Sequence, residues 1–123
     1  MCDSSIEVVE TREVERLYIA IDYDDTISAA PEMWFKIMCI MNEYGHDVRI
    51  VTARTDIEGM NLDIRTFLLG AEDDFPVIYC NGEQKEDVCE SQGFFVDIWC
   101  DDYPAIIPKR TALYTRVEEM GLV

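Results

Sequence analysis

Short apolar runs and longer segments of mixed polarity alternate along this chain. A nearly continuous apolar run is typical of a strand that is covered on both faces of a sheet. Such runs predict strands at residues 17–21, 48–51, 76–80 and 94–100. In the longer segments apolar residues recur every three or four positions, which is the spacing of a helix with one buried face. This spacing predicts helices at residues 31–44, 55–70 and 83–92.

Residues that favour helix ends support these boundaries. Pro31 suits the first turn of a helix, and Gly45 suits the left-handed residue that follows a last turn. Thr55 and Glu58 have the spacing of a capping box. We therefore expect the second helix to begin after Thr55 and to stop at Gly70.

The repeated order of strand and helix predicts an α/β fold, with one Rossmann-like domain of three layers and a mostly parallel sheet. We assign residues 17–123 to this domain, with a last helical turn at residues 115–120. Residues 1–16 differ from the rest in composition, and we expect an acidic arm or an extra strand there. In sheets of this kind, ligands bind at the carboxyl ends of the strands.

Composition narrows the partners that this domain can have. The 123 residues include 26 acidic and 10 basic ones, a formal net charge of −16, and 49% are hydrophobic. The chain can therefore bury a core beneath an acidic surface. The charge argues against binding to long nucleic acids, which needs Lys and Arg to replace phosphate counterions. It also argues against docking on anionic lipid.

The sequence indicates neither a membrane segment nor a metal site built from soft ligands. No apolar run is long enough to span a membrane, and residues 1–16 lack the apolar stretch of a signal peptide. The five cysteines form no C-x-x-C pair, and His46 is the single histidine, so neither a zinc site nor a site of paired histidines is indicated. We expect free thiols and a cytoplasmic location.

Polar residues follow all four predicted strands. In chain order they are Asp22, Asp24, Asp25, Thr52, Arg54, Lys85, Asp101 and Asp102. Because the carboxyl ends of parallel strands share one edge of a sheet, we expect these side chains to converge. An acidic pair alone carries little weight in so acidic a chain. We interpret Asp73 and Asp74, which precede a strand, as a solvated loop.

Several carboxylates in one small site would repel one another, and a divalent cation removes that conflict. Oxygen ligands from a few carboxylates favour Mg²⁺, which keeps several waters and binds phosphate as well. Lys85 and Thr52 can then hold phosphate oxygens. A carboxylate, a metal and a lysine together indicate phosphoryl transfer through an aspartyl-phosphate.

These residues, in this order, resemble the motifs of the haloacid dehalogenase-like (HAD) superfamily of phosphohydrolases. Residues 22–26 (Asp-Tyr-Asp-Asp-Thr) resemble its first motif, and Thr52, which ends Arg-Ile-Val-Thr, resembles its second. Lys85 is similar to the third motif, and the Asp101–Asp102 pair after Ile-Trp-Cys is similar to the fourth. The resemblance covers about residues 17–108.

The resemblance implies a role for each motif residue. Asp22 would be the nucleophile and a ligand of Mg²⁺. Asp24 would be the acid and base, with its backbone carbonyl on the metal. Thr52 and Lys85 would bind phosphate. Asp101 and Asp102 would hold Mg²⁺ directly or through water.

Too few residues separate the motifs for a cap domain, and family members with caps carry their substrate selectivity there. We therefore expect an open site and self-association of the chain. We also expect the first strand of the sheet to lie between the second and the fourth, so that the motif residues converge.

Asp25 stands where the family often has glycine, and we give it no catalytic role. Arg54 is a candidate phosphate ligand, or a surface arginine that offsets the acidic edge.

Other functions remain open at this stage. A receiver domain has a similar length, an acidic pair, a Thr and a Lys, but its phosphorylated Asp ends the third strand, where this chain has Cys80 and Asn81. A stronger alternative is a Mg²⁺-binding interaction module that keeps the fold without activity. The substrate of an active enzyme could be a small phosphate ester or a phosphorylated macromolecule.

Overall fold

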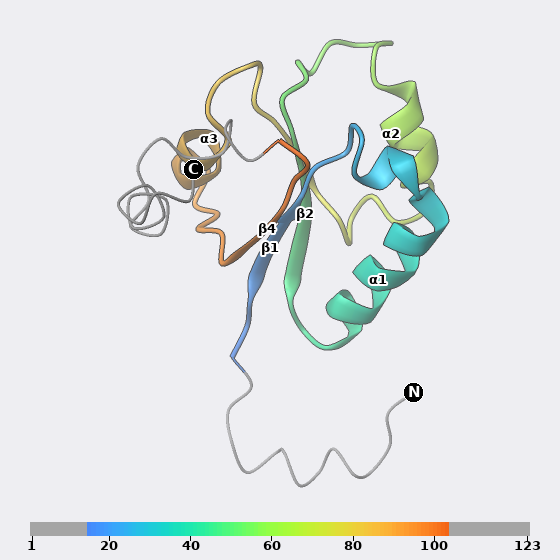
Figure 1. The fold of residues 1–123 in the computed structure, drawn as a ribbon, viewed down its shortest axis with the longest axis vertical. Helices are drawn as coiled ribbons and strands as arrows, with labels where there is room; N and C mark the ends of the chain where they lie inside the picture. Colours follow the sequence, from blue (N-terminus) through green and yellow to red (C-terminus); the bar gives the residue numbers. More distant parts are fainter. Residues whose placement is uncertain (1–14, 104–123) are drawn as a thin grey trace, which may run out of the picture.

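Four parallel strands form the central sheet in the computed structural model, which describes residues 15–103 (Figure 1). The strands are β1 (Tyr18–Ile21), β2 (Asp47–Thr52), β3 (Val77–Tyr79) and β4 (Ile98–Cys100), in the order β3-β2-β1-β4. The predicted parallel sheet, with its first strand between the second and the fourth, is therefore confirmed. The predictions for residues 115–120, and for residues 1–16 apart from the last two, lie outside the described residues.

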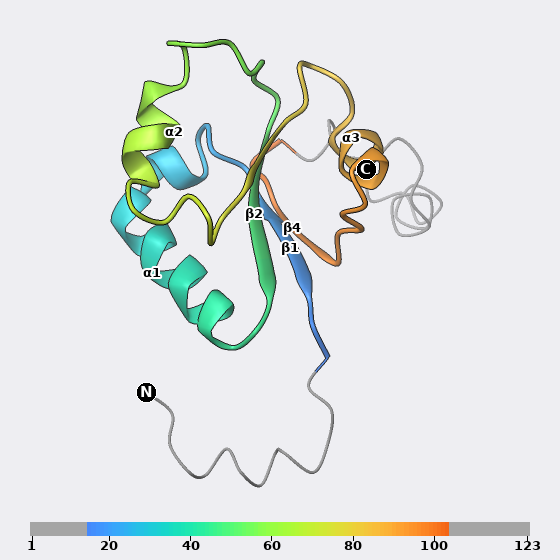
Figure 2. The ribbon, with the colours of Figure 1, turned by 180° about the vertical axis from the view of Figure 1, so that it is seen from behind.

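Helices cover both faces of the sheet, as the three-layer prediction requires (Figures 1 and 2). The 3-10 turn η2 (Ile27–Ala29), α1 (Pro31–Glu43) and α2 (Leu62–Phe67) lie on one face. The helix α3 (Lys85–Ser91) lies on the other. No helix within residues 15–103 is long and apolar enough to cross a membrane.

Alternate residues of the strands build two separate cores, because successive side chains of a strand point to opposite faces. The core beneath α1 and α2 contains four strand residues and three from the helical layer, namely Ile19, Ile21, Val48, Ile50, Met38, Ile64 and Leu68. The opposite face buries Ala20, Val51, Ile78, Cys89 and Phe94. The nearly continuous apolar runs of the sequence follow from this burial on both faces.

The register of the sheet brings the ends of β1 and β4 to one level. Ile21 is paired with Ile50 of β2 and with Cys100 of β4. The backbone N–H of Asp22 donates to the carbonyl of Cys100 at 2.9 Å, which extends this pairing by one residue. The residues that directly follow β1 and β4 therefore emerge side by side.

The capping box predicted at Thr55 and Glu58 is wrong, because α2 begins only at Leu62. The hydroxyl of Thr55 instead donates to the side-chain oxygen of Asn81, far along the chain. Gly59 has φ +84°, in the left-handed region, which interrupts any helix before Leu62. Residues 55–60 are accordingly an exposed loop.

The fourth strand is shorter than predicted. Phe94 is buried, but its N–H donates to the carbonyl of Cys89 at 2.9 Å and so closes the end of α3. Pairing with β1 is confined to Ile98–Cys100.

Candidate functional site

Three carboxylates meet where β1 and β4 end. Oxygen atoms of Asp22, Asp101 and Asp102 all lie within 4.8 Å of one another. The side chains line a cleft of about 310 Å³ at this edge of the sheet. The parallel pairing of the two strands is what places these residues together, since they are 79 and 80 positions apart in the chain.

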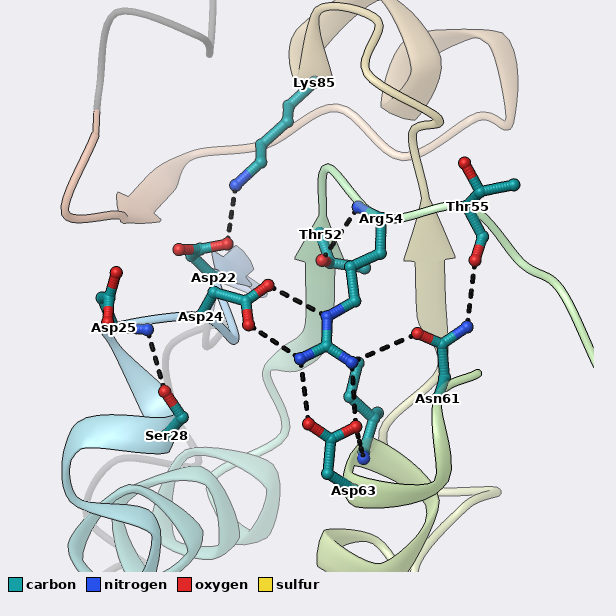
Figure 3. Close-up of polar contacts among 11 residues, drawn as sticks. Asp22, Asp24, Asp25, Ser28, Thr52, Arg54, Thr55, Asn61, Asp63 and Lys85 are labelled. Atoms are coloured by element: carbon teal, nitrogen blue, oxygen red, sulfur yellow. Dashed lines mark hydrogen bonds and ion pairs between the residues drawn. The ribbon is translucent and has the colours of Figure 1, made fainter. Parts of the chain in front are cut away.

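Lys85, the first residue of α3, reaches into this cluster from the other layer. Its Nζ lies 2.9 Å from Oδ1 of Asp22 (Figure 3). The same Nζ lies 2.5 Å from Oδ2 of Asp101, and the lysine side chain is only 2% exposed. A buried ammonium needs such partners, because an unpaired charge away from water is costly. Three carboxylates against one ammonium still leave two negative charges when all groups are ionised.

The electrostatics of the cluster favour a further positive charge. The pKa of Asp22 is raised to about 6, chiefly by burial; the hydrogen bond and charge of Lys85 oppose this rise, and repulsion from Asp101 adds to it. Burial opposes the charge of Lys85, but its hydrogen bonds to Asp101 and Asp22 raise its pKa above the ordinary value. The lysine is thus a stable cation at neutral pH, and its single positive charge neutralises only part of the negative charge of the three carboxylates.

The donor set fits a hard divalent cation. The three facing groups offer carboxylate oxygens, which suit Mg²⁺ and similar ions, and provide no soft ligand. Asp101 is oriented by two donors, the ammonium of Lys85 and the backbone N–H of Tyr103 at 2.9 Å from Oδ1. The carboxylate of Asp101 is therefore held in position by the fold.

Asp24 points away from this cluster and toward Arg54, the second residue after β2 (Figure 3). Nε of Arg54 lies 3.0 Å from Oδ2 of Asp24, and Nη2 lies 2.7 Å from Oδ1. The same guanidinium bonds both oxygens of Asp63 at 2.8 and 2.9 Å and Oδ1 of Asn61 at 3.2 Å. All five of its N–H groups therefore have protein acceptors.

This arginine network has consistent electrostatics. The hydrogen bonds that Arg54 donates to Asp24, and then those to Asp63, raise the pKa of Arg54, and the hydrogen bond from Arg54 lowers the pKa of Asp63. The guanidinium carbon also lies 5.2 Å from the centre of the Tyr23 ring, over its face. Tyr23 is buried in the core beside Phe67, so it supports the network from below.

The loop after β2 is tied to the loop after β3, and this fixes the backbone of Arg54. The N–H of Asn81 donates to the carbonyl of Arg54 at 3.0 Å, and the N–H of Gly82 donates to that of Ala53 at 2.8 Å. Asn81 takes φ +53°, a left-handed conformation that Asn tolerates better than most residues. The hydroxyl oxygen of Thr52, which is fully buried, accepts the N–H of Arg54 at 3.2 Å.

The chain matches no protein-family model, no curated protein and no solved structure.

The structure brings part of the predicted site together. It gathers the carboxylates of Asp22, Asp101 and Asp102, and Lys85 is bonded to the first two of them. Asp24 and Arg54 form a second group beside them, and Thr52 lies buried behind Arg54. Asp73 and Asp74 are exposed, as expected for a solvated loop.

Sequence reasoning missed Asn61 and Asp63 as members of the arginine network. Asp63 is one of 26 acidic residues and follows no strand, so nothing in the sequence singled it out. Asn61 is buried, with 5% exposure, and its Nδ2 donates to the carbonyl of Thr55 at 3.0 Å. A buried Asn just before a helix is a signal only once the true start of α2 is known.

Proposed function

We propose that this protein is a Mg²⁺-dependent phosphohydrolase that works through an aspartyl-phosphate on Asp22. The observation that carries the proposal is the position of Asp22. Its carboxylate is nearly buried at the sheet edge, lies against the ammonium of Lys85 and faces two further carboxylates across a cleft. The resemblance to the HAD superfamily supports the proposal, because the residues that match its motifs include those of this cluster, namely Asp22, Lys85, Asp101 and Asp102.

Asp22, Asp101 and Asp102 would hold Mg²⁺, together with the backbone carbonyl of Asp24. When bound, the cation would neutralise charge on the transferring phosphoryl group and orient it. Lys85 would hold a phosphate oxygen while it keeps the carboxylate of Asp22 in place. Thr52 would support the phosphate site through the backbone that follows it.

The reaction would proceed in two displacements. In the first, a carboxylate oxygen of Asp22 forms a bond to phosphorus, the bond from phosphorus to the ester oxygen breaks, and the leaving oxygen takes up a proton. In the second, water attacks phosphorus, gives up a proton to a base, and the bond to Asp22 breaks to release inorganic phosphate. One ester and one water thus give one alcohol and one phosphate.

Asp24 would supply the proton in the first step and accept one in the second. In the structure both of its oxygens accept N–H groups of Arg54, so it has to release at least one of them to donate a proton. Its side chain is 52% exposed, which leaves room for that movement. An incoming phosphate oxygen could take the freed N–H of Arg54.

The open cleft leaves the size of the substrate unrestricted. A small phosphate ester and a phosphorylated macromolecule both fit an uncapped site, and a second copy of the chain could cover it. Within residues 15–103, the four cysteines Cys39, Cys80, Cys89 and Cys100 are free, which agrees with a cytoplasmic location.

A panel of phosphate esters, assayed with and without Mg²⁺, tests the proposal. We expect phosphate release that requires Mg²⁺ and that is lost in Asp22→Asn. The competing function is an inactive Mg²⁺-binding module, which the engagement of Asp24 by Arg54 favours. Mg²⁺ binding without release of phosphate from any ester would decide for that module.

A further inference from the structure

A second hollow, larger than the first, lies beside the cleft. It has a volume of about 630 Å³ and is formed by the loop after β2 and the start of α2, from Arg54 to Asp63. Its volume is in the range of ligand pockets. The proposed chemistry makes no use of it so far.

The polar groups that line this hollow are already engaged with one another. Asn61 accepts from Arg54 and donates to the carbonyl of Thr55. Both oxygens of Asp63 accept from Arg54. The surface left for a ligand is mainly apolar.

Three apolar side chains supply that surface. Ile57, Met60 and Leu62 line the hollow, although they are 48%, 65% and 59% exposed. Apolar groups gathered in a concave surface gain from covering by an apolar ligand. Asp56 and Glu58 are exposed on the same loop, so an anionic ligand would be repelled.

Arg54 stands between the two hollows. It lines the larger one and holds Asp24, which lines the cleft together with Asp22. Figure 3 shows the order of side chains, from Lys85 through Asp22, Asp24 and Arg54 to Asn61 and Asp63. The larger hollow therefore lies on the Asp24 side of Asp22, opposite Lys85.

The loop that forms the hollow is held in shape by hydrogen bonds. Thr55 is tied to Asn81, and the N–H groups of Ile57 and Met60 donate to the carbonyls of Thr55 and Ile57, each at 3.0 Å. A pocket that is formed before the ligand arrives saves the cost of ordering it.

We propose that this hollow is the leaving-group pocket and that it selects phosphate esters of uncharged, apolar alcohols. The inference rests on the proposed function, in which Asp24 protonates the leaving oxygen. A phosphoryl group at Asp22 directs its ester oxygen toward Asp24, and an apolar group on that oxygen extends past Arg54 onto Ile57, Met60 and Leu62. When the bond from phosphorus to the ester oxygen breaks, the leaving oxygen takes the proton from Asp24, and the resulting alcohol departs from this pocket.

The first test compares 2-naphthyl phosphate with phenyl phosphate, whose leaving groups differ mainly in apolar area. We expect kcat/KM to be higher for the naphthyl ester. We expect Met60→Asp to lower the naphthyl-to-phenyl ratio of kcat/KM about tenfold, the scale of a lost apolar pocket contact. Leu69→Asp is the matched control, because Leu69 is 79% exposed and lies outside the pocket. An unchanged ratio in Met60→Asp would overturn the proposal.

A second measurement is independent of turnover. We expect 2-naphthol, added to the full chain, to shift the methyl NMR signals of Ile57, Met60 and Leu62, and not those of Met33 or Leu69. Equal or absent shifts, together with turnover of esters, would overturn the pocket alone. Selective shifts without turnover of any ester would overturn the proposed function and, with it, the leaving-group role, and would leave an apolar ligand site.

Discussion

Arg54 holds both carboxylate oxygens of Asp24, at 3.0 Å from Nε to Oδ2 and 2.7 Å from Nη2 to Oδ1. The pair is partly exposed, with 25% of the arginine side chain and 52% of the aspartate accessible. Ion pairs of this exposure contribute little to stability. We therefore expect the Arg54–Asp24 ion pair to fix the position of the Asp24 side chain rather than to stabilise the fold.

Arg54→Lys separates two roles for this arginine. A lysine keeps the charge but cannot bind a carboxylate through two parallel N–H groups. If Arg54 positions Asp24, kcat should fall about tenfold while KM changes little. A rise in KM at constant kcat would instead identify Arg54 as a phosphate ligand. Steady-state kinetics on one ester give both values.

Asp63→Asn is the companion to that variant. The amide can accept only through one oxygen, so Arg54 loses one of its two contacts with this side chain. We expect a smaller fall in kcat than for Arg54→Lys and an unchanged affinity for Mg²⁺. A loss of Mg²⁺ affinity would show that the arginine network and the carboxylate cluster are one site.

The Mg²⁺ prediction uses a matched pair of acidic residues. Asp102→Asn removes a carboxylate from the cluster, and Asp74→Asn removes one from an exposed loop. Both variants change the net charge equally. Calorimetry should show Mg²⁺ binding weakened by about tenfold or more for Asp102→Asn only. Equal weakening in both would mean that Mg²⁺ responds to the overall charge of −16 and not to a site.

The sheet and its acidic edge were predictable because both depend on local patterns and one general rule. The apolar runs at β1 and β2 reflect burial on both faces, and parallel strands end at the same edge. That was enough to bring Asp22 and Asp101 together. The presence of Lys85 at this edge was predictable from its position shortly after β3. It is the first residue of α3, which covers one face of the sheet.

The arginine network could not be predicted because it depends on contacts distant in sequence. The Thr55 side chain bonds Asn81, 26 positions away, in place of a local helix cap. That bond and the left-handed Gly59 delay the start of α2, and only then do Asn61 and Asp63 face Arg54. The spacing of Thr55 and Glu58 is also compatible with a capped helix, and for this reason the sequence predicted the wrong start for the helix.

The metal-free protein should lose stability as the pH rises through the pKa of Asp22. Burial raises that pKa from 3.8 to about 6, so the folded chain binds a proton more tightly than the unfolded chain. This contribution is complete below about pH 3.8 and is lost as the pH passes about 6. In EDTA, Asp22→Asn should therefore melt higher than the wild type at pH 7.5, with a smaller difference at pH 5. Melting temperatures that differ equally at both values would contradict this.

Asp25 offers a test of backbone strain at the cleft. Its φ is +63°, in the left-handed region, and its N–H donates to the hydroxyl of Ser28 at 2.9 Å. Gly adopts this conformation freely, whereas Ala does not. We expect Asp25→Gly to be more stable than Asp25→Ala by about 1 kcal/mol, by urea unfolding. Both should keep activity, and a loss in both would give the Asp25 carboxylate a role.

The two aspartates after β1 should fail in different ways. Asp22→Asn should abolish turnover, because an amide neither attacks phosphorus nor binds Mg²⁺ well. Asp24→Asn keeps the proposed nucleophile and loses the proposed base of the second displacement, and such help is worth roughly 10²–10⁴-fold. With a good leaving group, which needs no proton, Asp24→Asn should accumulate phosphoryl-enzyme.

Mass spectrometry of acid-quenched protein measures that intermediate directly. It should show one added phosphoryl group on Asp22 in Asp24→Asn and none in Asp22→Asn. Fluoroberyllate, which mimics a phosphoryl group on a carboxylate, should inhibit the wild type and slow this labelling. Phosphoryl transfer to any other residue, or full activity of Asp22→Asn, would show that Asp22 is not the nucleophile. The contact of Asp22 with Lys85 would then serve only to hold the sheet edge together.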